Sequence, residues 1–360
     1  MSSDHAQNVV VKLGTSSLTD ADGVIDIAFI DRVASELASL HADGARVTVV
    51  SSGAIAAGLP ALGLDAGARP ADAVALQAIS SIGQPTLVET WRRAFASSEL
   101  VVGQILLAPH NFGDRSQYLH ARSTLNKLHE LGVIPIVNEN DAVTDSEIRY
   151  GDNDRIAALV ANMVEADTLV LLTDTDGVLT ADPNVDPTAS LIEEIADFDD
   201  LDADTIGGAG SARGSGGMAS KLTAAKIASH SGIRTVIANA KRESVIADAV
   251  AGLAGVGTSV APQGAVTSAR KLWIEFALSA AARVVVDEGA QYALSQGGRS
   301  LLSVGIVEVD GSFDRRDPIE VANANGDVFA KGLARVSSAD IDAELDGQVV
   351  IHADDFVLLG

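Results

Sequence analysis

The chain has 360 residues, enough for about two domains that each bury their own core. Its formal net charge of −24 argues against broad, sequence-independent binding of nucleic acid, because such binding requires lysine and arginine to neutralise phosphates. Cysteine is absent, which excludes disulfides, cysteine-ligated zinc and thiol nucleophiles. The N-terminal residues contain no basic run, and no segment reaches the ~18 consecutive apolar residues of a membrane span. We therefore expect a soluble, cytoplasmic protein.

Short apolar runs alternate with longer amphipathic segments through about residue 258. The apolar runs predict strands at 9–11, 47–50, 101–107, 134–137, 169–172 and 235–238. Helical patterns lie between them, for example over 27–38 and 154–164. Strands that are buried on both faces and alternate with helices predict a three-layer αβα sandwich with a mostly parallel central sheet.

The first predicted strand ends in a lysine beside a glycine turn, in the segment VVVKLGTSSLT. Lys12 is followed by Gly14 and three hydroxyl residues, which together form a compact site for an anion beside a cation. A lysine that only caps a strand in solvent is the alternative. The next strand, in VVSSGAIAAG, ends in Ser51 and Ser52 before Gly53 opens a helix. Such a helix terminus attracts anions, but an ordinary turn capped by serine explains the pattern as well.

The segment PIVNENDAVTDSEIRYGDND gathers carboxylates and amides after another strand. We interpret Asn138, Asp141 and Asn153 as ligands of a polar substrate. Asp154 is interpreted as a carboxylate that fixes cations, since one carboxylate can hold two ammonium groups. Three further acidic residues of the stretch are expected in a solvated loop: Glu139, Asp145 and Glu147.

The segment LLTDTDGVLTADP places Thr173 and Asp174 at a strand end, where they can face a nucleotide. Lys12, Ser51, Ser52, the 138–141 segment and this pair all follow directly on apolar strands. The carboxyl ends of parallel strands meet at one edge of a sheet, so we expect these polar groups to converge on one crevice.

The segment GGAGSARGSGGMASK has six glycines leading to Lys221 and a helix. Gly214, Gly216 and Ala219 match the Gly-x-Gly-x-x-Ala pattern of dinucleotide-binding loops. No strand precedes the match, however, and Asn239 stands about 20 residues further on, where a ribose-binding acid belongs. A lysine after a glycine-rich turn instead favours a site for phosphate, with a flexible surface loop as the alternative.

The pattern changes after residue 257, where small and polar residues precede a basic pair at 270–271. We place one domain at 1–260, a linker at 261–279 and a small β-rich domain at 280–360. Asp310-Gly311 and Asn325-Gly326 are turn signals within the last of these.

In combination and order, these segments resemble the amino acid kinase superfamily, and within it the glutamate 5-kinase family with a C-terminal PUA domain. The resemblance covers nearly the whole chain, including VVVKLGTSSLT, SSGAIAAG, VGQILL, IPIVNENDAV, GDND, LLTDTDGVLTADP, GSGGMASKL, ARKLW and VDEGA. It implies transfer of the ATP γ-phosphoryl group to the side-chain carboxylate of L-glutamate. The product would be L-glutamyl 5-phosphate, formed in the first step of proline biosynthesis.

The resemblance also implies the roles of individual residues. Lys12 and Lys221 would be the catalytic cations, and Asp154 would orient them. The glutamate site would comprise Ser52, Asn138, Asp141 and Asn153. The nucleotide site would comprise Lys12, Thr173, Asp174, Ser215, Gly216, Gly217, Met218, Ala219, Ser220 and Lys221.

No residue is assigned as a ligand of a resident metal, although the resemblance implies a requirement for Mg²⁺ with ATP. It further implies feedback inhibition by proline and assembly as a homodimer or homotetramer. PUA modules bind RNA elsewhere, but the acidity of this chain makes a nucleic-acid partner unexpected here.

Three alternatives remain open. The first is another member of the same superfamily, acting on aspartate, N-acetylglutamate, carbamate or a nucleoside monophosphate. The second is an RNA-binding protein that acts through its C-terminal domain. The third is a nicotinamide-dependent oxidoreductase, supported only by the Gly-x-Gly-x-x-Ala match.

Overall fold

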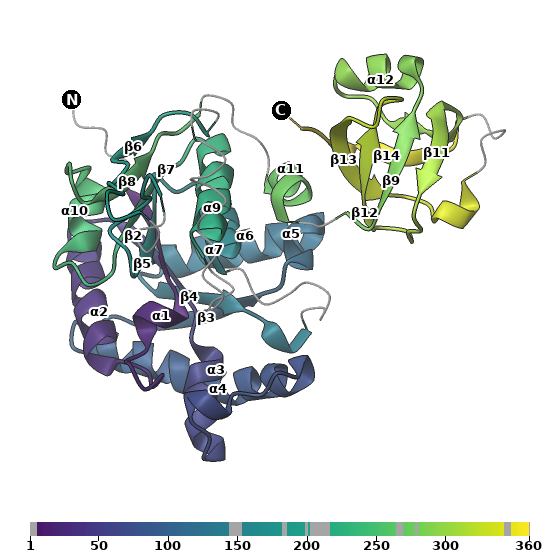
Figure 1. Ribbon diagram of the computed structural model, residues 1–360. Coiled ribbons are helices and arrows are strands. Elements are labelled where there is room, and N and C mark those ends of the chain that lie inside the picture. Colours follow the sequence, from purple (N-terminus) through teal and green to yellow (C-terminus); the bar gives the residue numbers. More distant parts are fainter. Residues whose placement is uncertain are drawn as a thin grey trace. The chain divides into compact units, whose positions relative to one another are not determined.

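The computed structural model describes residues 6–143, 153–181, 186–198, 201, 217–263, 269–277, 280–341 and 347–359. The chain divides into two units, Met1–Val266 and Thr267–Gly360 (Figure 1). Among the described residues, no helix is long and apolar enough to cross a membrane.

The first unit is organised around an eight-stranded sheet with the order β3-β4-β2-β1-β5-β7-β8-β6. Neighbouring strands are parallel except for β7 and β8, which are antiparallel. The strands are β1 (Asn8–Leu13), β2 (Arg46–Ser51), β3 (Val102–Leu107), β4 (Ile134–Glu139), β5 (Thr168–Thr173), β6 (Glu194–Ile195), β7 (Arg234–Asn239) and β8 (Gly257–Val260). This arrangement confirms the predicted, mostly parallel α/β fold.

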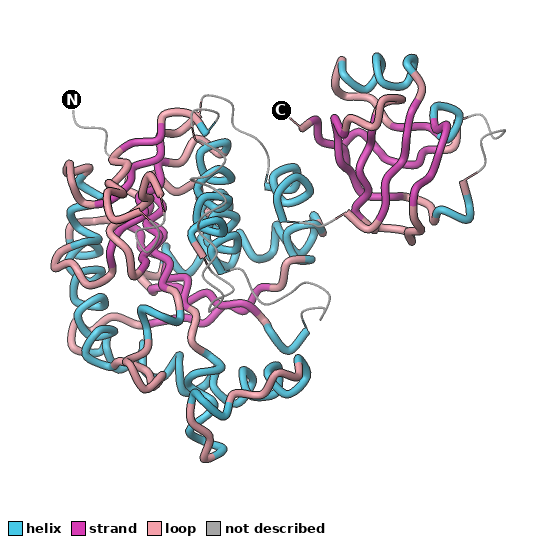
Figure 2. Tube along the Cα trace, in the orientation of Figure 1, coloured by secondary structure: helices cyan, strands magenta, loops and turns pink. Residues whose placement is uncertain are grey.

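Helices cover both faces of this sheet, as Figures 1 and 2 show. One layer contains α2 (Ile27–Ala42) and α10 (Val245–Ala251), which contact one another, and also α4 (Ala73–Ala96), which packs against α2. The other contains α6 (Arg115–Glu130), α7 (Asn153–Met163) and α9 (Met218–His230). Shorter helical segments are α1 (Thr15–Leu18), α3 (Ala54–Gly58), η1 (Leu59–Leu62), η2 (Ala66–Ala68), α5 (His110–Gly113) and η3 (Asp141–Val143).

The alternation of side chains along β1 explains how a lysine comes to lie inside this sandwich. Val9, Val11 and Leu13 belong to the hydrophobic core that also contains residues of α2, α4 and α10. Because successive side chains of a strand point to opposite faces, Lys12 lies on the face covered by α7 and α9. The ammonium group is therefore brought to the helices that carry its partners.

Helices α3 and α4 approach one another through two glycines. A Cβ atom added at Gly83 would lie 1.8 Å from the carbonyl oxygen of Ala54, and one at Gly58 would lie 2.2 Å from the carbonyl oxygen of Ile79. Only glycine leaves room for backbones this close. The contact fixes α4 against the turn that follows β2.

The second unit contains a six-stranded sheet with the order β10-β14-β13-β12-β9-β11, in which only β9 and β12 are parallel neighbours. Its strands are β9 (Ala282–Val286), β10 (Leu301–Leu302), β11 (Ile306–Asp310), β12 (Pro318–Ala322), β13 (Val328–Ala334) and β14 (Val349–Leu358). Its helices are α11 (Ala269–Leu272), the π-helical turn η5 (Trp273–Ala277), α12 (Glu288–Ser295), η6 (Ser303–Gly305) and η7 (Ser338–Asp340). The predicted β-rich C-terminal domain is confirmed.

The helical segment 269–277 belongs to this second unit. It contacts β13 and β14, and its Trp273 and Ile274 are buried. The carboxylate of Asp355, a buried residue of β14, is ion-paired with Arg270 and lies 3.5 Å from Nη2 of Arg335. Much of the segment predicted as a linker is thus a helical element anchored on the C-terminal sheet.

Candidate active site

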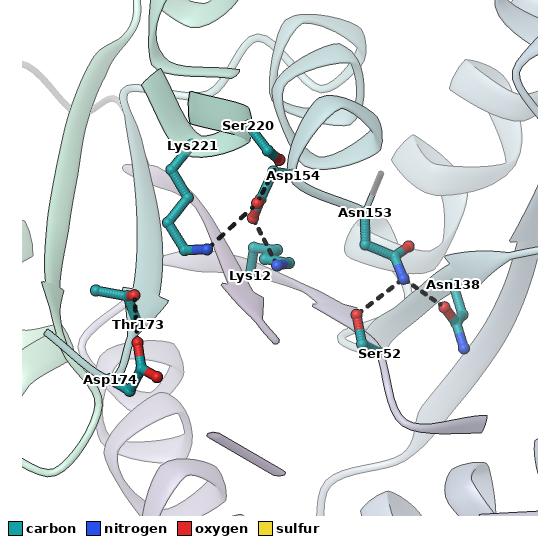
Figure 3. Close-up of polar contacts among 9 residues, drawn as sticks. All are labelled: Lys12, Ser52, Asn138, Asn153, Asp154, Thr173, Asp174, Ser220 and Lys221. Atoms are coloured by element: carbon teal, nitrogen blue, oxygen red, sulfur yellow. Dashed lines mark hydrogen bonds and ion pairs between the residues drawn. The ribbon is translucent and has the colours of Figure 1, made fainter. Parts of the chain in front are cut away.

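A buried carboxylate between two lysines forms the centre of the candidate site (Figure 3). Lys12 Nζ lies 2.5 Å from Oδ1 of Asp154, and Lys221 Nζ lies 3.4 Å from Oδ2. The Asp154 side chain is fully buried, and the lysine side chains are only 4% and 7% exposed. Residues that are distant in the sequence therefore meet at one point, as predicted.

Three elements deliver these groups to the same edge of the sheet. Lys12 is next to last in β1, Asp154 is the second residue of α7, and Lys221 lies in the first turn of α9. Ser220, the residue before Lys221, donates a hydrogen bond of 2.8 Å from Oγ to Oδ2 of Asp154. Asp154 is thus held by α9 and β1 together.

The electrostatics of this cluster shift the pKa values of the carboxyl group and of Lys221. Burial raises the pKa of Asp154, but the charges of Lys12 and then Lys221 outweigh burial and hold the pKa below its ordinary value. Burial lowers the pKa of Lys221, an effect that the charge of Asp154 only partly opposes. Two ammonium groups that face one carboxylate form a cationic arrangement that an anionic phosphate group could join.

Gly14 keeps open the space beside the Lys12 ammonium. A Cβ atom at this position would lie 3.5 Å from Nζ of Lys12 and 3.9 Å from Oγ of Ser16. Gly14, which the sequence predicts to be part of an anion-binding turn, therefore lies beside the ammonium group of Lys12.

A second cluster joins amides and a hydroxyl on one side of Asp154 in Figure 3. Nδ2 of Asn153 donates to Oγ of Ser52 at 2.9 Å and to Oδ1 of Asn138 at 3.1 Å. Nδ2 of Asn138 and Oδ1 of Asn153 are buried and have no hydrogen-bond partner among the described residues. Buried polar atoms are normally satisfied, so these two are available to a polar ligand.

Asp141 extends this polar region into η3. One of its carboxylate oxygens accepts a hydrogen bond of 2.5 Å from Oγ of Ser80 in α4. Burial raises the pKa of Asp141, and the hydrogen bond from Ser80 opposes this rise. No motif marked Ser80 in the sequence. The one feature that distinguishes Ser80 is its place in α4, where a serine lies among buried residues such as Ile79 and Gly83.

The expectation of a solvated Glu139 is wrong. Glu139 is the last residue of β4 and only 1% exposed, and its backbone N–H donates to Oδ1 of Asn138 at 2.8 Å. The acidic composition of the segment suggested a loop, but the strand continues through this position. Asp145 and Glu147 lie outside the described residues.

Two of the predicted nucleotide residues, Thr173 and Asp174, lie on the other side of Asp154 in Figure 3. Thr173 ends β5, and its Oγ1 donates to Oδ1 of Asp174 at 3.2 Å. Gly217 is the N-terminal cap of α9, which begins with Met218 and continues through Ala219 and Ser220. Ser215 and Gly216 lie outside the described residues.

Strand order explains this division into two sides. Asn138 is next to last in β4 and Ser52 follows β2, whereas Thr173 ends β5. Strand β1, which carries Lys12, lies between β2 and β5 in the sheet. The central lysine therefore separates an amide-rich region from a region that begins at β5 and α9.

Within the described part of the chain, no three His, Asp or Glu side chains are grouped so as to hold a metal ion. Both oxygens of Asp154 face ammonium groups. This chemistry fits Mg²⁺ that arrives on the phosphates of a nucleotide, since Mg²⁺ commonly takes most of its ligands from phosphate and water.

Comparisons with known proteins agree with this geometry. The profile of the amino acid kinase family matches residues 7–239, and that of the PUA domain matches residues 282–355. The chain is 42% identical over 369 residues to the glutamate 5-kinase of Paraburkholderia phytofirmans, covering 98% of each protein. It is 43% identical over 336 residues to the glutamate 5-kinase of Herminiimonas arsenicoxydans, covering 93% of this chain and 89% of the relative.

A solved structure shares the fold of the first unit. The carbamate kinase of Giardia lamblia bound to AMP-PNP aligns with a TM-score of 0.52 and 19% identity, covering 72% of this chain and 99% of the kinase. Fold, family profile and full-length similarity lead to one conclusion. The chain belongs to the glutamate 5-kinase branch of the amino acid kinase family and carries a C-terminal PUA domain.

Proposed function

We propose that this chain is an ATP-dependent glutamate 5-kinase that converts L-glutamate to L-glutamyl 5-phosphate, the first step of proline biosynthesis. The single observation that carries the proposal is the buried Asp154 carboxylate that holds Lys12 and Lys221 beside one another. The proposal is also supported by two relatives that are named glutamate 5-kinase and are similar to this chain over nearly its full length.

The chemistry of the reaction explains why two cations are needed. A glutamate side chain has a reference pKa of ~4.3, so the acceptor is ionised at neutral pH and requires no general base. The obstacle is repulsion between this carboxylate and the phosphates of ATP. Catalysis of phosphoryl transfer therefore consists mainly of positioning and charge stabilisation.

Each catalytic side chain has a role that follows from its place. Lys12 lies between the two polar regions and would contact the transferred phosphoryl group during the reaction. Lys221 would stabilise the phosphates from the nucleotide side. Asp154 takes no proton, because both ammonium groups keep it ionised, and it orients the two lysines.

The two substrates would bind on opposite sides of Lys12. We assign Ser52, Asn138, Asp141 and Asn153 to glutamate, since amide, hydroxyl and carboxylate groups match its α-carboxylate and ammonium. We assign Thr173, Asp174 and the start of α9 to the nucleotide, where backbone N–H groups of a helix N-terminus favour phosphate. Mg²⁺ would be bound with ATP, neutralising phosphate charge without a dedicated protein cage.

Further properties belong to the same proposal. We include feedback inhibition by proline, assembly as a homodimer or homotetramer, and a cytoplasmic location, where ATP and free glutamate are both available. The organisation into a kinase domain at 1–260, a linker at 261–279 and a PUA-like domain at 280–360 is likewise proposed, with residues 269–277 of the linker packed as a helical element on the C-terminal sheet. The first unit contains every described residue assigned to catalysis.

The test is release of ADP by the purified full-length chain with ATP and Mg²⁺. Activity is expected with L-glutamate and not with aspartate, N-acetylglutamate, carbamate or UMP. Hydroxylamine should trap the acyl phosphate as a hydroxamate. ADP release with another acceptor, but none with L-glutamate, would refute the proposed substrate.

A further inference from the structure

Ser80, a residue of α4, belongs to no part of the proposed catalytic machinery. Its side chain is buried, with 1% of the residue exposed. Its hydroxyl donates a hydrogen bond of 2.5 Å to Oδ2 of Asp141, a residue 61 positions further along the chain. Helix α4 thus contacts the proposed glutamate site through a polar side chain.

The partner of this hydroxyl is unusual for a serine within a helix. Such a serine commonly donates to the carbonyl oxygen four residues earlier, and its neighbour does so: Oγ of Ser81 donates to the carbonyl oxygen of Gln77 at 3.0 Å. Ser80 instead donates to a carboxylate on another element. The bond therefore stabilises the position of Asp141 and does little for α4 itself.

Helix α4 is itself held in place by contacts with neighbouring segments. Its Gly83 packs directly on the backbone of α3, and the next residue, Gln84, donates from Nε2 to the carbonyl oxygen of Glu139 at 3.3 Å. Ser80 and Gln84 are one helical turn apart and lie on the same face of the helix. Their hydrogen bonds reach the backbone carbonyl group of residue 139 and the side chain of residue 141, which are separated by only one residue.

The hydrogen bond also favours the charged form of Asp141. Burial raises the pKa of this carboxyl group, while the Ser80 hydroxyl and the charge of Arg69 oppose the rise. A charged carboxylate in a fixed orientation is what an ammonium group requires.

We propose that Ser80 is a positioning residue that orients the Asp141 carboxylate toward the ammonium group of L-glutamate and thereby sets the affinity for this substrate. The inference rests on the proposed function, and in particular on Asp141 as part of the glutamate site. The expected effect is confined to glutamate, because the partner of Ser80, Asp141, follows β4, which β2 and β1 separate from β5 in the sheet.

The experiment is steady-state kinetics of Ser80→Ala with glutamate and ATP varied separately. Loss of a hydrogen bond to a charged group should raise the KM for glutamate ~tenfold, with kcat and the KM for ATP within about twofold of the parent. Ser80→Thr keeps the hydroxyl and should restore most of the affinity. Asp141→Ala should raise the glutamate KM at least as much as Ser80→Ala.

Ser81→Ala is the matched control, because it removes an exposed hydroxyl from the adjacent position of the same helix. It should leave both KM values unchanged. If Ser80→Ala and Ser81→Ala give the same glutamate KM in an active enzyme, the inference is overturned while the proposed function stands. If Ser80→Ala lowers kcat and raises both KM values, Ser80 serves only to maintain the fold. A parent enzyme without activity toward glutamate would overturn both proposals.

Discussion

At the scale of single residues, Asp154 has one negative charge and two cationic partners. Both lysine side chains share this one carboxylate and are almost completely buried. Buried ion pairs lose their hydration, so the cluster is weak evidence for stability of the free protein. We propose that it is arranged for a phosphate ligand.

Removal of either lysine should affect the chemical step more than binding. Lys12→Ala and Lys221→Ala are each expected to lower kcat by ~10²–10³-fold, since each removes a charge that is most needed as the phosphoryl group is transferred. The KM for glutamate should change far less. Initial rates over a range of both substrates test this, and a near-normal kcat in both variants would exclude the assigned roles.

The pH dependence of kcat should depend on Lys221. Its pKa lies below the ordinary value of 10.5, so the ammonium group loses its proton at a lower pH than an exposed lysine does, and kcat should fall as pH rises through that pKa. Asp154, with a lowered pKa, stays charged as the pH falls and should cause no loss of rate near neutrality. Lys221→Arg keeps its charge at high pH and should move the alkaline fall upward. An alkaline limb that is identical in both enzymes would contradict this assignment.

At the scale of elements, the sequence predicted the six main strands of the first sheet and the edge at which the site forms. This succeeded because buried parallel strands appear as uninterrupted apolar runs, and because Lys12, Asn138 and Thr173 lie at or near the ends of such runs. The short strands β6 and β8 were not predicted, since they have too few residues for a periodic pattern.

The contacts that hold the site together were harder to foresee. Ser80 reaches Asp141 from α4, and nothing in the local sequence of either residue indicates the other. Such pairs depend on how the helices pack on the sheet. The direction in which an individual side chain points depends on the same packing. Glu139 was misassigned for a similar reason, because local charge suggested a loop where tertiary packing extends the strand.

The contact between α3 and α4 gives a prediction at this scale. Gly83→Ala introduces a Cβ atom against the carbonyl oxygen of Ala54, so the helices must separate. We expect a loss of about 1–3 kcal/mol in the free energy of unfolding, as for other overpacked positions. Thermal or urea unfolding measures this change. Gly63→Ala is unsuitable as a control, because Gly63 has a φ of +67°, where alanine is strained. The control is Ala78→Gly, which lies on the same helix as Gly83 and measures the cost of a change in helix propensity alone.

At the scale of the whole molecule, the net charge of −24 coexists with a site built around two cations. An anionic substrate must approach an acidic protein, so attraction is local and confined to the site. The acidity also disfavours general binding of nucleic acid by the chain as a whole.

The division into two units gives a prediction about Asp355. Its replacement by alanine removes the shared ion-pair partner of Arg270 and Arg335 and should destabilise the C-terminal unit by ~1–3 kcal/mol. Glutamate kinase activity below the unfolding temperature should persist. Calorimetry of the full chain, alongside kinetic assays, tests both statements.

Glu320→Ala breaks the more exposed pair with Arg283 and should cost less than ~1 kcal/mol. Equal effects of the two substitutions would show that Asp355 has no special structural role.

The separation of Lys12, Asp154 and Lys221 along the chain has a consequence for synthesis on the ribosome. Lys12 emerges first, but α9, which carries Lys221, is translated more than 200 residues later. Until that helix has left the exit tunnel, Asp154 can hold only one ammonium group. A partly translated chain therefore cannot assemble the two-lysine centre, which forms only when nearly all of the first unit has been made.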